Sequence, residues 1–237
     1  MLIGLKEGET SLPLKTSKLK GDAVAGFFIS FEGIDKSGKS TQAEMLAKHL
    51  QSKGHEVVFT YEPGATELGK EIRHLVLTWK PHGVVDPTAE MFLFAADRAQ
   101  HVSEVVKPAL AKNKIVITDR YIDSTLAYQG YGRGLDLDQL TSTQQVATGG
   151  LLPDMTIWVD VDLETARARF GKEKADRLES ENDGLFERVS AGYEKLCVAS
   201  PNRFLRIDGC RTIKDIFEDI CGHVETRLEE HPQFENV

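Results

Sequence analysis

The chain has 237 residues, 41% of them hydrophobic, which is enough for a single core and one globular domain. A formal net charge of −8 argues against a broad basic surface for nucleic acid, so anionic ligands must be held by local groups of Arg and Lys. No apolar run approaches the ~18 residues that span a bilayer, and no secretory signal is expected. Three widely spaced cysteines favour small packed residues in a reducing compartment over a disulfide or metal site. We therefore expect a cytoplasmic protein without nucleic-acid or membrane partners.

Apolar runs alternate with helical patterns along most of the chain. Residues 1–25 precede the first convincing strand and are expected to form a flexible N-terminal extension, and residues 231–237 a C-terminal tail. Strands are predicted over 27–31, 56–61, 114–119, 155–161 and 204–208. Helices are predicted over 42–50, 67–77, 87–112, 185–198 and 213–228. This order predicts an α/β domain over 26–230 with helices on both faces of a parallel sheet, and ligands beyond the carboxyl ends of the strands.

The most specific motif lies where the first strand meets the first helix. Residues 33–41 read G-I-D-K-S-G-K-S-T, with the spacing G-x-x-x-x-G-K-S/T. Such glycines let backbone N–H groups face an anion, and the new helix adds its positive N-terminal end. Lys39 can then neutralise phosphate oxygens and Ser40 can ligate Mg²⁺. A glycine-rich turn is the alternative, but the flanking strand and helix favour a nucleoside triphosphate. The residues expected at that ligand are Gly33, Ile34, Asp35, Lys36, Ser37, Gly38, Lys39, Ser40 and Thr41.

Polar residues also follow two other predicted strands. Asp119 and Arg120 come directly after a buried strand, where the carboxylate could hold Mg²⁺ and the guanidinium could fork onto a second phosphate. An ordinary surface ion pair is the alternative. Glu62 follows the end of the second predicted strand. Judged on its residue types alone, the segment that begins there is as consistent with a simple turn as with a catalytic role.

Two further segments allow more than one interpretation. Phe94 and Arg98 are four residues apart and share a helix face, where they could stack on and read a nucleobase. An aromatic residue at helical spacing is, however, more often part of the core. The segment at about 167–183 carries both charge signs, which is typical of a solvated loop or of a lid that closes over phosphates.

Several motifs in order resemble the thymidylate kinase family over about residues 27–228. They are F-E-G-I-D at 31–35, E-P-G at 62–64, F-A-A-D-R at 94–98, D-R-Y at 119–121, S-T-L-A-Y-Q-G at 124–130 and D-R at 176–177. The resemblance implies a three-layer P-loop kinase fold with a five-stranded parallel sheet, and a homodimer. It also implies Mg²⁺-dependent transfer of the γ-phosphoryl group of ATP to dTMP, giving dTDP and ADP for dTTP synthesis.

The resemblance further implies roles for individual residues. Lys39 and Ser40 would bind the ATP phosphates and Mg²⁺, while Glu62 and Asp119 would arrange the metal and its water. The residues implied at dTMP are Arg73 and Arg120 on its phosphate, Asp35 at the 3′-hydroxyl, Tyr128 against the 2′ position, Phe94 stacked on thymine, Arg98 at O4, and Thr125 with Gln129 on the remaining polar edge. This agrees with the chemistry, because phosphoryl transfer needs positioning and charge neutralisation more than covalent catalysis.

Two positions depart from the family pattern. Relatives usually supply a catalytic arginine from the loop or the lid, whereas Lys36 occupies the loop position here and Lys172 and Lys174 accompany Arg177 in the lid. We expect Lys36 and Arg177 to share the stabilisation of the transition state. Tyr61 stands where bacterial relatives commonly have Arg before E-P-G, which removes a charge near the acceptor phosphate.

Two other functions are compatible with the phosphate loop. A kinase for another deoxynucleotide or deoxynucleoside would share the sheet and loop, because fold does not fix substrate. A nucleotide-dependent switch would bind without transferring phosphate. Phe94, Arg98 and Gln129 favour thymine, and the chain lacks the N-K-x-D motif that reads guanine.

Overall fold

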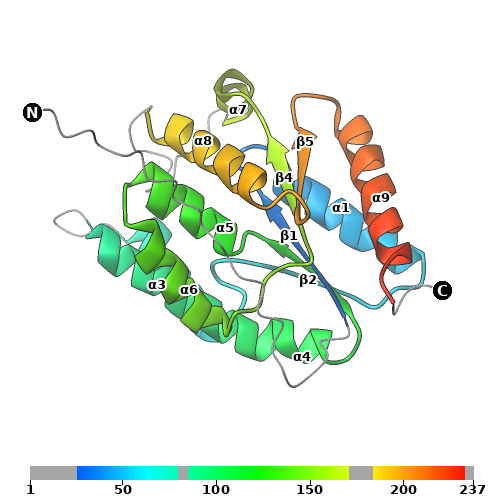
Figure 1. The fold of residues 1–237 in the computed structure, drawn as a ribbon, viewed down its shortest axis with the longest axis horizontal. Coiled ribbons are helices and arrows are strands. Elements are labelled where there is room, and N and C mark those ends of the chain that lie inside the picture. Colours follow the sequence, from blue (N-terminus) through cyan, green and yellow to red (C-terminus); the bar gives the residue numbers. More distant parts are fainter. Residues whose placement is uncertain (1–25, 80–84, 171–183, 233–237) are drawn as a thin grey trace, which may run out of the picture.

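A parallel sheet of five strands forms the centre of the molecule, as predicted. The computed structural model describes residues 26–79, 85–170 and 184–232. The strands are β1 (Phe27–Glu32), β2 (Val57–Tyr61), β3 (Ile115–Asp119), β4 (Met155–Asp160) and β5 (Phe204–Asp208). Their order across the sheet is β2-β3-β1-β4-β5, and every pair of neighbours is parallel (Figure 1). Strand β1 is buried along its whole length because helices cover both of its faces.

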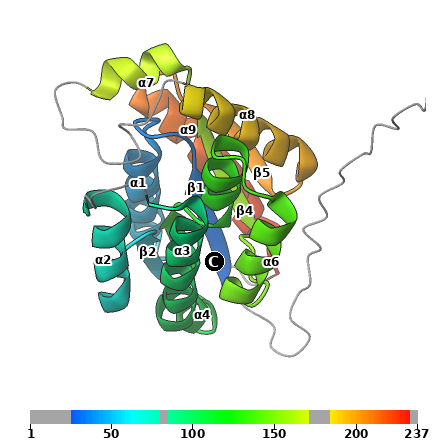
Figure 2. The same ribbon diagram turned by 90° about the vertical axis from the view of Figure 1, so that its left-hand side faces the viewer.

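Helices and short π-helical segments connect the strands. Their bounds are α1 (Lys39–Ser52), α2 (Glu67–Arg73), η1 (His74–Thr78), α3 (Pro87–His101), η2 (Val102–Val106), α4 (Lys107–Leu110), α5 (Ile122–Thr125), η3 (Leu126–Gly132), α6 (Leu137–Thr148), α7 (Leu163–Phe170), α8 (Gly184–Ala199) and α9 (Ile213–Glu229), where η marks a π-helical segment. Figures 1 and 2 show α1 and α9 on one face of the sheet and α3, α5, α6 and α8 on the other. The predicted three-layer α/β architecture is therefore confirmed.

The two faces of β1 supply two parts of the core. Phe27, Ile29 and Phe31 point toward α1 and α9 and pack with apolar side chains of those helices. Phe28 points to the opposite face and packs against β3 and the helical run from α3 to α4. This alternation follows from the two-residue period of a strand. It leaves Glu32, the last residue of β1, on the same face as Phe28.

The strand register aligns the carboxyl ends at one edge of the sheet. Phe31 of β1 and Tyr61 of β2 both pair with Asp119 of β3, and Glu32 pairs with Trp158 of β4. The residues after these strands therefore emerge close together, which is where a doubly covered parallel sheet binds its ligands.

The structure differs from the sequence prediction in several elements. The long helix predicted over 87–112 ends at Leu110 and contains the π-helical segment η2. The helices between residues 122 and 148 were not predicted. The predicted extension over 1–25 and most of the predicted lid and tail fall outside the described residues. Within the described ranges, no helix is long and apolar enough to span a membrane.

Candidate functional site

The phosphate loop has the backbone conformation that its glycines allow. Gly33 and Gly38 adopt φ values of 141° and 95°. A Cβ on Gly33 would lie 2.5 Å from the carbonyl oxygen of Val159, so only glycine fits there. Lys36 also has a positive φ, 61°, which is uncommon for a residue with a side chain and costs conformational energy. The loop is therefore held in one shape, and α1 begins directly after it at Lys39.

Lys39 is buried beneath this loop. Its Nζ lies 3.4 Å from the carbonyl oxygen of Ile34 and 3.8 Å from Oδ1 of Asp35. Burial and the neighbouring guanidinium of Arg120 lower the pKa of the Lys39 ammonium. Although burial opposes the change, Arg120 and Lys39 lower the pKa of Asp35 to about 2. Ser37 is buried in the loop, and Thr41 is exposed in the first turn of α1.

Arg169 of α7, a residue that no sequence motif indicates, reaches the same loop. Its Nη1 donates to the carbonyl oxygens of Ser37 at 3.0 Å and Lys36 at 3.4 Å, and its Nη2 donates to Gly209 at 2.8 Å. It therefore ties the phosphate loop to the turn that follows β5. The charged pattern of its segment could have indicated an arginine near the phosphates. The pattern does not tell which of the arginines reaches the loop.

Asp119 and Ser40 form a pair that suits a hard cation. Ser40 Oγ donates to Asp119 Oδ2, while Asp119 Oδ1 is buried without a hydrogen-bond partner among the described residues. A buried, unpaired carboxylate oxygen beside a phosphate loop is suited to Mg²⁺, which prefers oxygen ligands. No cluster of three His, Cys, Asp or Glu side chains able to hold a metal occurs in the described ranges. Mg²⁺ does not need one, because it usually takes one or two carboxylates together with substrate phosphates.

A cavity of about 120 Å³ opens beside the phosphate loop. Its lining residues come from the carboxyl edge of the sheet and from the helices that follow it. They are Asp35, Glu62, Pro63, Arg73, Leu77, Phe94, Arg98, Arg120, Ser124, Thr125, Tyr128 and Gln129. Every residue implied at dTMP by the family resemblance is in this set, so the structure brings them together.

Arg120 stands at the end of this cavity nearest to the phosphate loop. Its φ of 71° is uncommon for a residue with a side chain. Its Nη2 donates to Asp35 Oδ1 at 2.5 Å, and its Nη1 donates to the Gly33 carbonyl oxygen and to Ser124 Oγ, both at 3.1 Å. Tyr128 lies beneath the guanidinium and donates its hydroxyl to Asp35 Oδ2 at 3.0 Å. These contacts hold a fixed positive charge beside the loop.

Arg73 is the second predicted phosphate contact. It ends α2, and its Nη1 donates to the carbonyl oxygen of Pro63 at 2.7 Å. Its guanidinium lies 5.9 Å from the ring centre of Tyr61. The tyrosine that departs from the family pattern therefore stands next to the predicted clamp.

Glu32, the second residue of the F-E-G-I-D motif, lies behind Arg120. Its carboxylate accepts from the backbone N–H of Tyr121 at 2.8 Å, from Ser124 Oγ at 2.5 Å and from the Tyr193 hydroxyl at 3.2 Å. Since Ser124 is also the acceptor for Arg120, Glu32 supports the position of that guanidinium through one hydroxyl.

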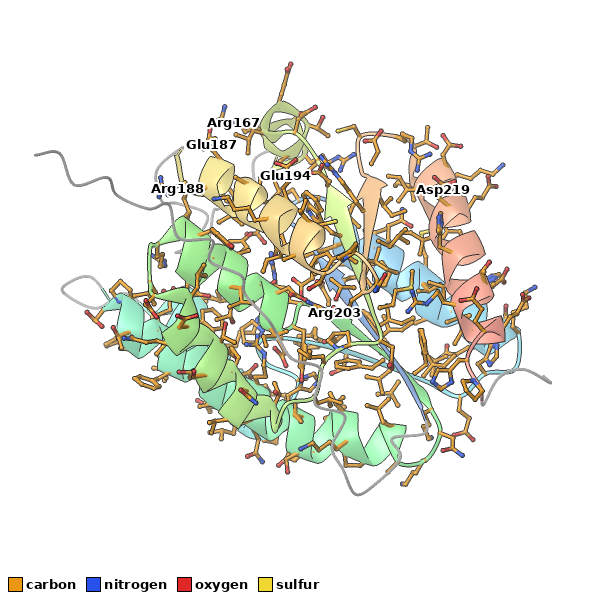
Figure 3. All side chains as sticks on the ribbon, viewed as in Figure 1. Arg167, Glu187, Arg188, Glu194, Arg203 and Asp219 are labelled. Atoms are coloured by element: carbon orange, nitrogen blue, oxygen red, sulfur yellow. The ribbon has the colours of Figure 1, made fainter. Side chains whose placement is uncertain are left out.

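A second buried carboxylate accompanies Glu32. Asp123 receives both Nη atoms of Arg203, at 2.5 and 2.9 Å. Arg203, labelled in Figure 3, lies just before β5 and so joins the edge of the sheet to α5. Burial, together with the Asp123 carboxylate, raises the pKa of Glu32 to about 7.

Arg98 is a buried cation with an ordered set of acceptors, not a surface residue. Its Nε donates to Glu62 Oε2 at 2.7 Å, its Nη1 to Thr125 at 2.9 Å and to Gln144, and its Nη2 to the Tyr121 carbonyl oxygen at 2.9 Å. A guanidinium has five N–H groups. Within the described residues four are used, which leaves one on Nη2 for a ligand in the cavity.

Glu62 supports Arg98 from behind. Its other oxygen, Oε1, lies 2.7 Å from Nδ1 of His101, whose Nε2 lies 2.7 Å from the Thr60 hydroxyl. Although burial opposes the change, Arg98 and His101 lower the pKa of Glu62. Both carboxylate oxygens are thus engaged by side chains of α3, and the predicted contact of Glu62 with a metal stays a prediction. His101 was not singled out in the sequence because an amphipathic pattern assumes that polar residues on a helix are exposed, whereas His101 is buried.

Gln129 and Phe94 complete the inner part of the cavity. Gln129 is buried and donates its Nε2 to Glu90 Oε1 at 2.9 Å, and Glu90 also pairs with Arg133. Phe94 is half-buried on α3. Glu90 is four residues before Phe94 and eight before Arg98, so its place on the same helix face could have been found from the sequence.

The predicted lid cations cannot be placed. Lys172, Lys174 and Arg177 lie outside the described residues, so the structure does not say which of them approaches the phosphates. Lys36 lies in the described loop and is half-buried there.

Comparison with known proteins gives one consistent result. A sequence model of the thymidylate kinase family matches residues 31–220. The chain is 46% identical over 202 residues to a thymidylate kinase of Dehalococcoides mccartyi (85% of this chain, 97% of the relative), and 43% identical over 209 residues to one of Trichormus variabilis (87% and 99%). The crystal structure of thymidylate kinase from Ehrlichia chaffeensis superposes with a TM-score of 0.66 at 33% identity, covering 84% of this chain and 99% of that one.

Proposed function

Because the chain belongs to the thymidylate kinase family, we propose that it transfers the γ-phosphoryl group of ATP to dTMP and releases dTDP and ADP. The observation that carries this proposal is that one cavity joins Arg98 and Gln129, which we propose to read the base, to Arg120 and Asp35 beside the phosphate loop. A donor and an acceptor at the inner end suit the O4 and N3–H groups of thymine. The cations at the outer end suit a monophosphate facing the triphosphate of ATP.

The chain's own residues act mainly by position and charge. Lys39 and the backbone of the phosphate loop bind the β- and γ-phosphates, while Arg120 and Arg73 hold the acceptor phosphate in line with them. Asp35 receives the 3′-hydroxyl of the deoxyribose, and Tyr128 leaves no room for a 2′-hydroxyl. Because Arg120 is fixed by Asp35, Gly33 and Ser124 before any ligand binds, little reorganisation is needed during transfer.

Mg²⁺ is the cofactor that these residues suit. Ser40 and Asp119 would hold it, since Asp119 Oδ1 is an unpaired buried oxygen within the described part of the chain. When bound, the ion would neutralise charge on the phosphate oxygens. Glu62 instead supports the base-reading arginine in this proposal.

The transition state also needs a cation between donor and acceptor. We assign this to Lys36 of the loop together with Arg177 of the lid. A lysine is a compact charge that can stabilise phosphoryl oxygens without the bidentate geometry of arginine. Arg169 acts on the loop backbone in this scheme and not on the phosphates.

The protein is proposed to act as a homodimer in the cytoplasm. Phe92 of α3 and Val146 of α6 are 57% and 84% exposed on two helices of the same layer (Figure 2), and exposed apolar side chains on adjacent helices favour an interface. The three cysteines, Cys197, Cys210 and Cys221, are free thiols, and the proposed compartment is a reducing one.

A coupled ADP-release assay with ATP and Mg²⁺ tests the proposed activity. The acceptors are dTMP, dUMP, dCMP, dGMP and thymidine. We expect dTMP to give the highest kcat/KM. A higher value with dCMP, dGMP or thymidine would indicate a different kinase, and ATP binding without ADP release for any acceptor would indicate a switch.

A further inference from the structure

The amide of Gln129 has only one orientation available. Its neighbour Glu90 is fully buried, and an ionised carboxylate can accept hydrogen bonds but cannot donate them. The nitrogen end of the Gln129 amide must therefore face Glu90, at 2.9 Å from Oε1. The oxygen end then faces away from Glu90 and is the one acceptor that this side chain can offer a ligand in the cavity that Gln129 lines.

Arg133 is the cationic partner of Glu90. Arg133 Nε lies 2.8 Å from Glu90 Oε1, and its Nη2 donates to Oε2 at 3.3 Å. A buried carboxylate without a cation would take up a proton and could then donate a hydrogen bond. The guanidinium of Arg133 contacts both oxygens of Glu90, so turning the Gln129 amide over would bring its oxygen against a carboxylate that is already paired with a cation.

This orientation matters for the choice of base. Thymine and uracil present an oxygen at position 4 and an N–H at position 3, whereas cytosine presents an amino group and an unprotonated nitrogen at those positions. The remaining N–H of Arg98 and the oxygen of Gln129 complement the first pattern and oppose both groups of the second. If Gln129 could turn over, one of these two mismatches would disappear.

We propose that Glu90 is a positioning residue that, held by Arg133, fixes the Gln129 amide and so makes the site select thymine and uracil over cytosine. The inference rests on the proposed function, because it takes dTMP as the acceptor. It assigns to Glu90 a role in specificity that a merely structural ion pair would not have.

Two substitutions of Glu90 separate these roles. Glu90→Leu removes the acceptor, so Gln129 can turn over, and the ratio of kcat/KM for dTMP to that for dCMP should fall by about 10-fold or more. Glu90→Gln should remain within about 3-fold of the wild-type ratio, because Arg133 keeps the amide oxygen of the new residue at the Oε1 position, where it still accepts from Gln129. Glu104→Gln, an exposed change at the end of the same helical run, is the matched control.

The ratio of dTMP to dUMP provides an internal reference. Both bases present the same edge to Gln129, so this ratio should change by less than about 3-fold in Glu90→Leu. If Glu90→Leu fails to fold because Arg133 loses its partner, the double variant Glu90→Leu/Arg133→Met removes the unpaired charge and tests the same prediction.

The inference is overturned if a folded Glu90→Leu or double variant retains the wild-type ratio of dTMP to dCMP, or if its activity falls equally with dTMP, dUMP and dCMP. Either result leaves the dTMP activity of the wild-type protein standing. If the wild-type protein itself does not prefer dTMP to dCMP, the proposed function fails, and this inference fails with it.

Discussion

At the scale of single residues, the proposed site depends on buried carboxylates that stand behind its arginines. Arg98 presents one N–H to the cavity and uses four others on protein acceptors. Glu62 and Glu32 stand behind Arg98 and Arg120 respectively, and each is fully buried. Such groups fix the direction of a donor before the ligand arrives, which is what electrostatic preorganisation requires.

Loss of Arg98 should therefore destabilise the protein as well as damage base recognition. Arg98→Met leaves the carboxylate of Glu62 buried without its guanidinium, at a cost of about 3–5 kcal/mol in the free energy of unfolding. Urea denaturation measures this change. The double variant Arg98→Met/Glu62→Gln should regain a large part of the loss, and an Arg98→Met protein as stable as the wild type would contradict the ion-pair account.

Glu32 should make stability depend on pH. Its pKa is raised from 4.5 to about 7, so between these pH values the folded protein holds a proton that the unfolded chain has released. The stabilisation is complete below pH 4.5 and is lost as the pH rises through about 7. We expect the free energy of unfolding of the wild type, compared with Glu32→Gln, to fall by about 3 kcal/mol between pH 4.5 and pH 8. Parallel pH profiles for the two proteins would show that Glu32 does not titrate in this range.

At the scale of elements, the helices after β3 carry much of the inner cavity. Helix α6 supplies Gln144 to Arg98, and it begins at the N-cap residue Asp136, whose side chain accepts from the backbone N–H of Gln139 at 2.8 Å. These contacts place the start and one face of the helix.

Asp136→Ala should lower the free energy of unfolding by about 1 kcal/mol, the usual cost of losing an N-cap. Because Asp136 does not line the cavity beside the phosphate loop, kcat with dTMP should be unchanged. Thermal unfolding and steady-state kinetics on the same sample test both parts. A change in kcat without a change in stability would mean that the cap acts on the site directly.

Helices and strands with a clear hydrophobic pattern or motif were predicted from the sequence. Helices that bury polar side chains were not. The order of β1, the phosphate loop and α1 follows from local spacing alone. The helices from 122 to 148 were missed because Ser124, Thr125 and Gln129 are buried there, whereas the amphipathic pattern assumes that polar residues are exposed. Glu90 and His101 were overlooked for the same reason, because both are polar residues that the fold buries. Conflicts of this kind between local pattern and fold are expected at functional sites.

At the scale of the whole molecule, the sheet register brings the site together. The pairing of Phe31 and Tyr61 with Asp119 sets the ends of three strands at one edge, so residues more than 80 positions apart meet around Arg120. The outer surface of α3 and α6, bearing Phe92 and Val146, is the proposed dimer contact.

Phe92→Glu should convert the proposed dimer to a monomer. Placing a charge at the centre of an apolar interface leaves it desolvated without a partner, which typically costs several kcal/mol of association energy. Light scattering after size exclusion gives the mass directly, and Val198→Glu, an exposed apolar position on α8, is the matched control. A wild-type protein that is already monomeric would contradict the proposed assembly.

Passage of one phosphoryl group from ATP to dTMP at the phosphate loop can be followed with a label. With γ-labelled ATP, Mg²⁺ and dTMP, the wild type should produce labelled dTDP. Lys39→Ala should remain folded and slow this transfer by about 100-fold or more, because it removes a preorganised positive charge at the phosphates. Label appearing only as inorganic phosphate, or transfer to dTMP at the wild-type rate in Lys39→Ala, would contradict the account.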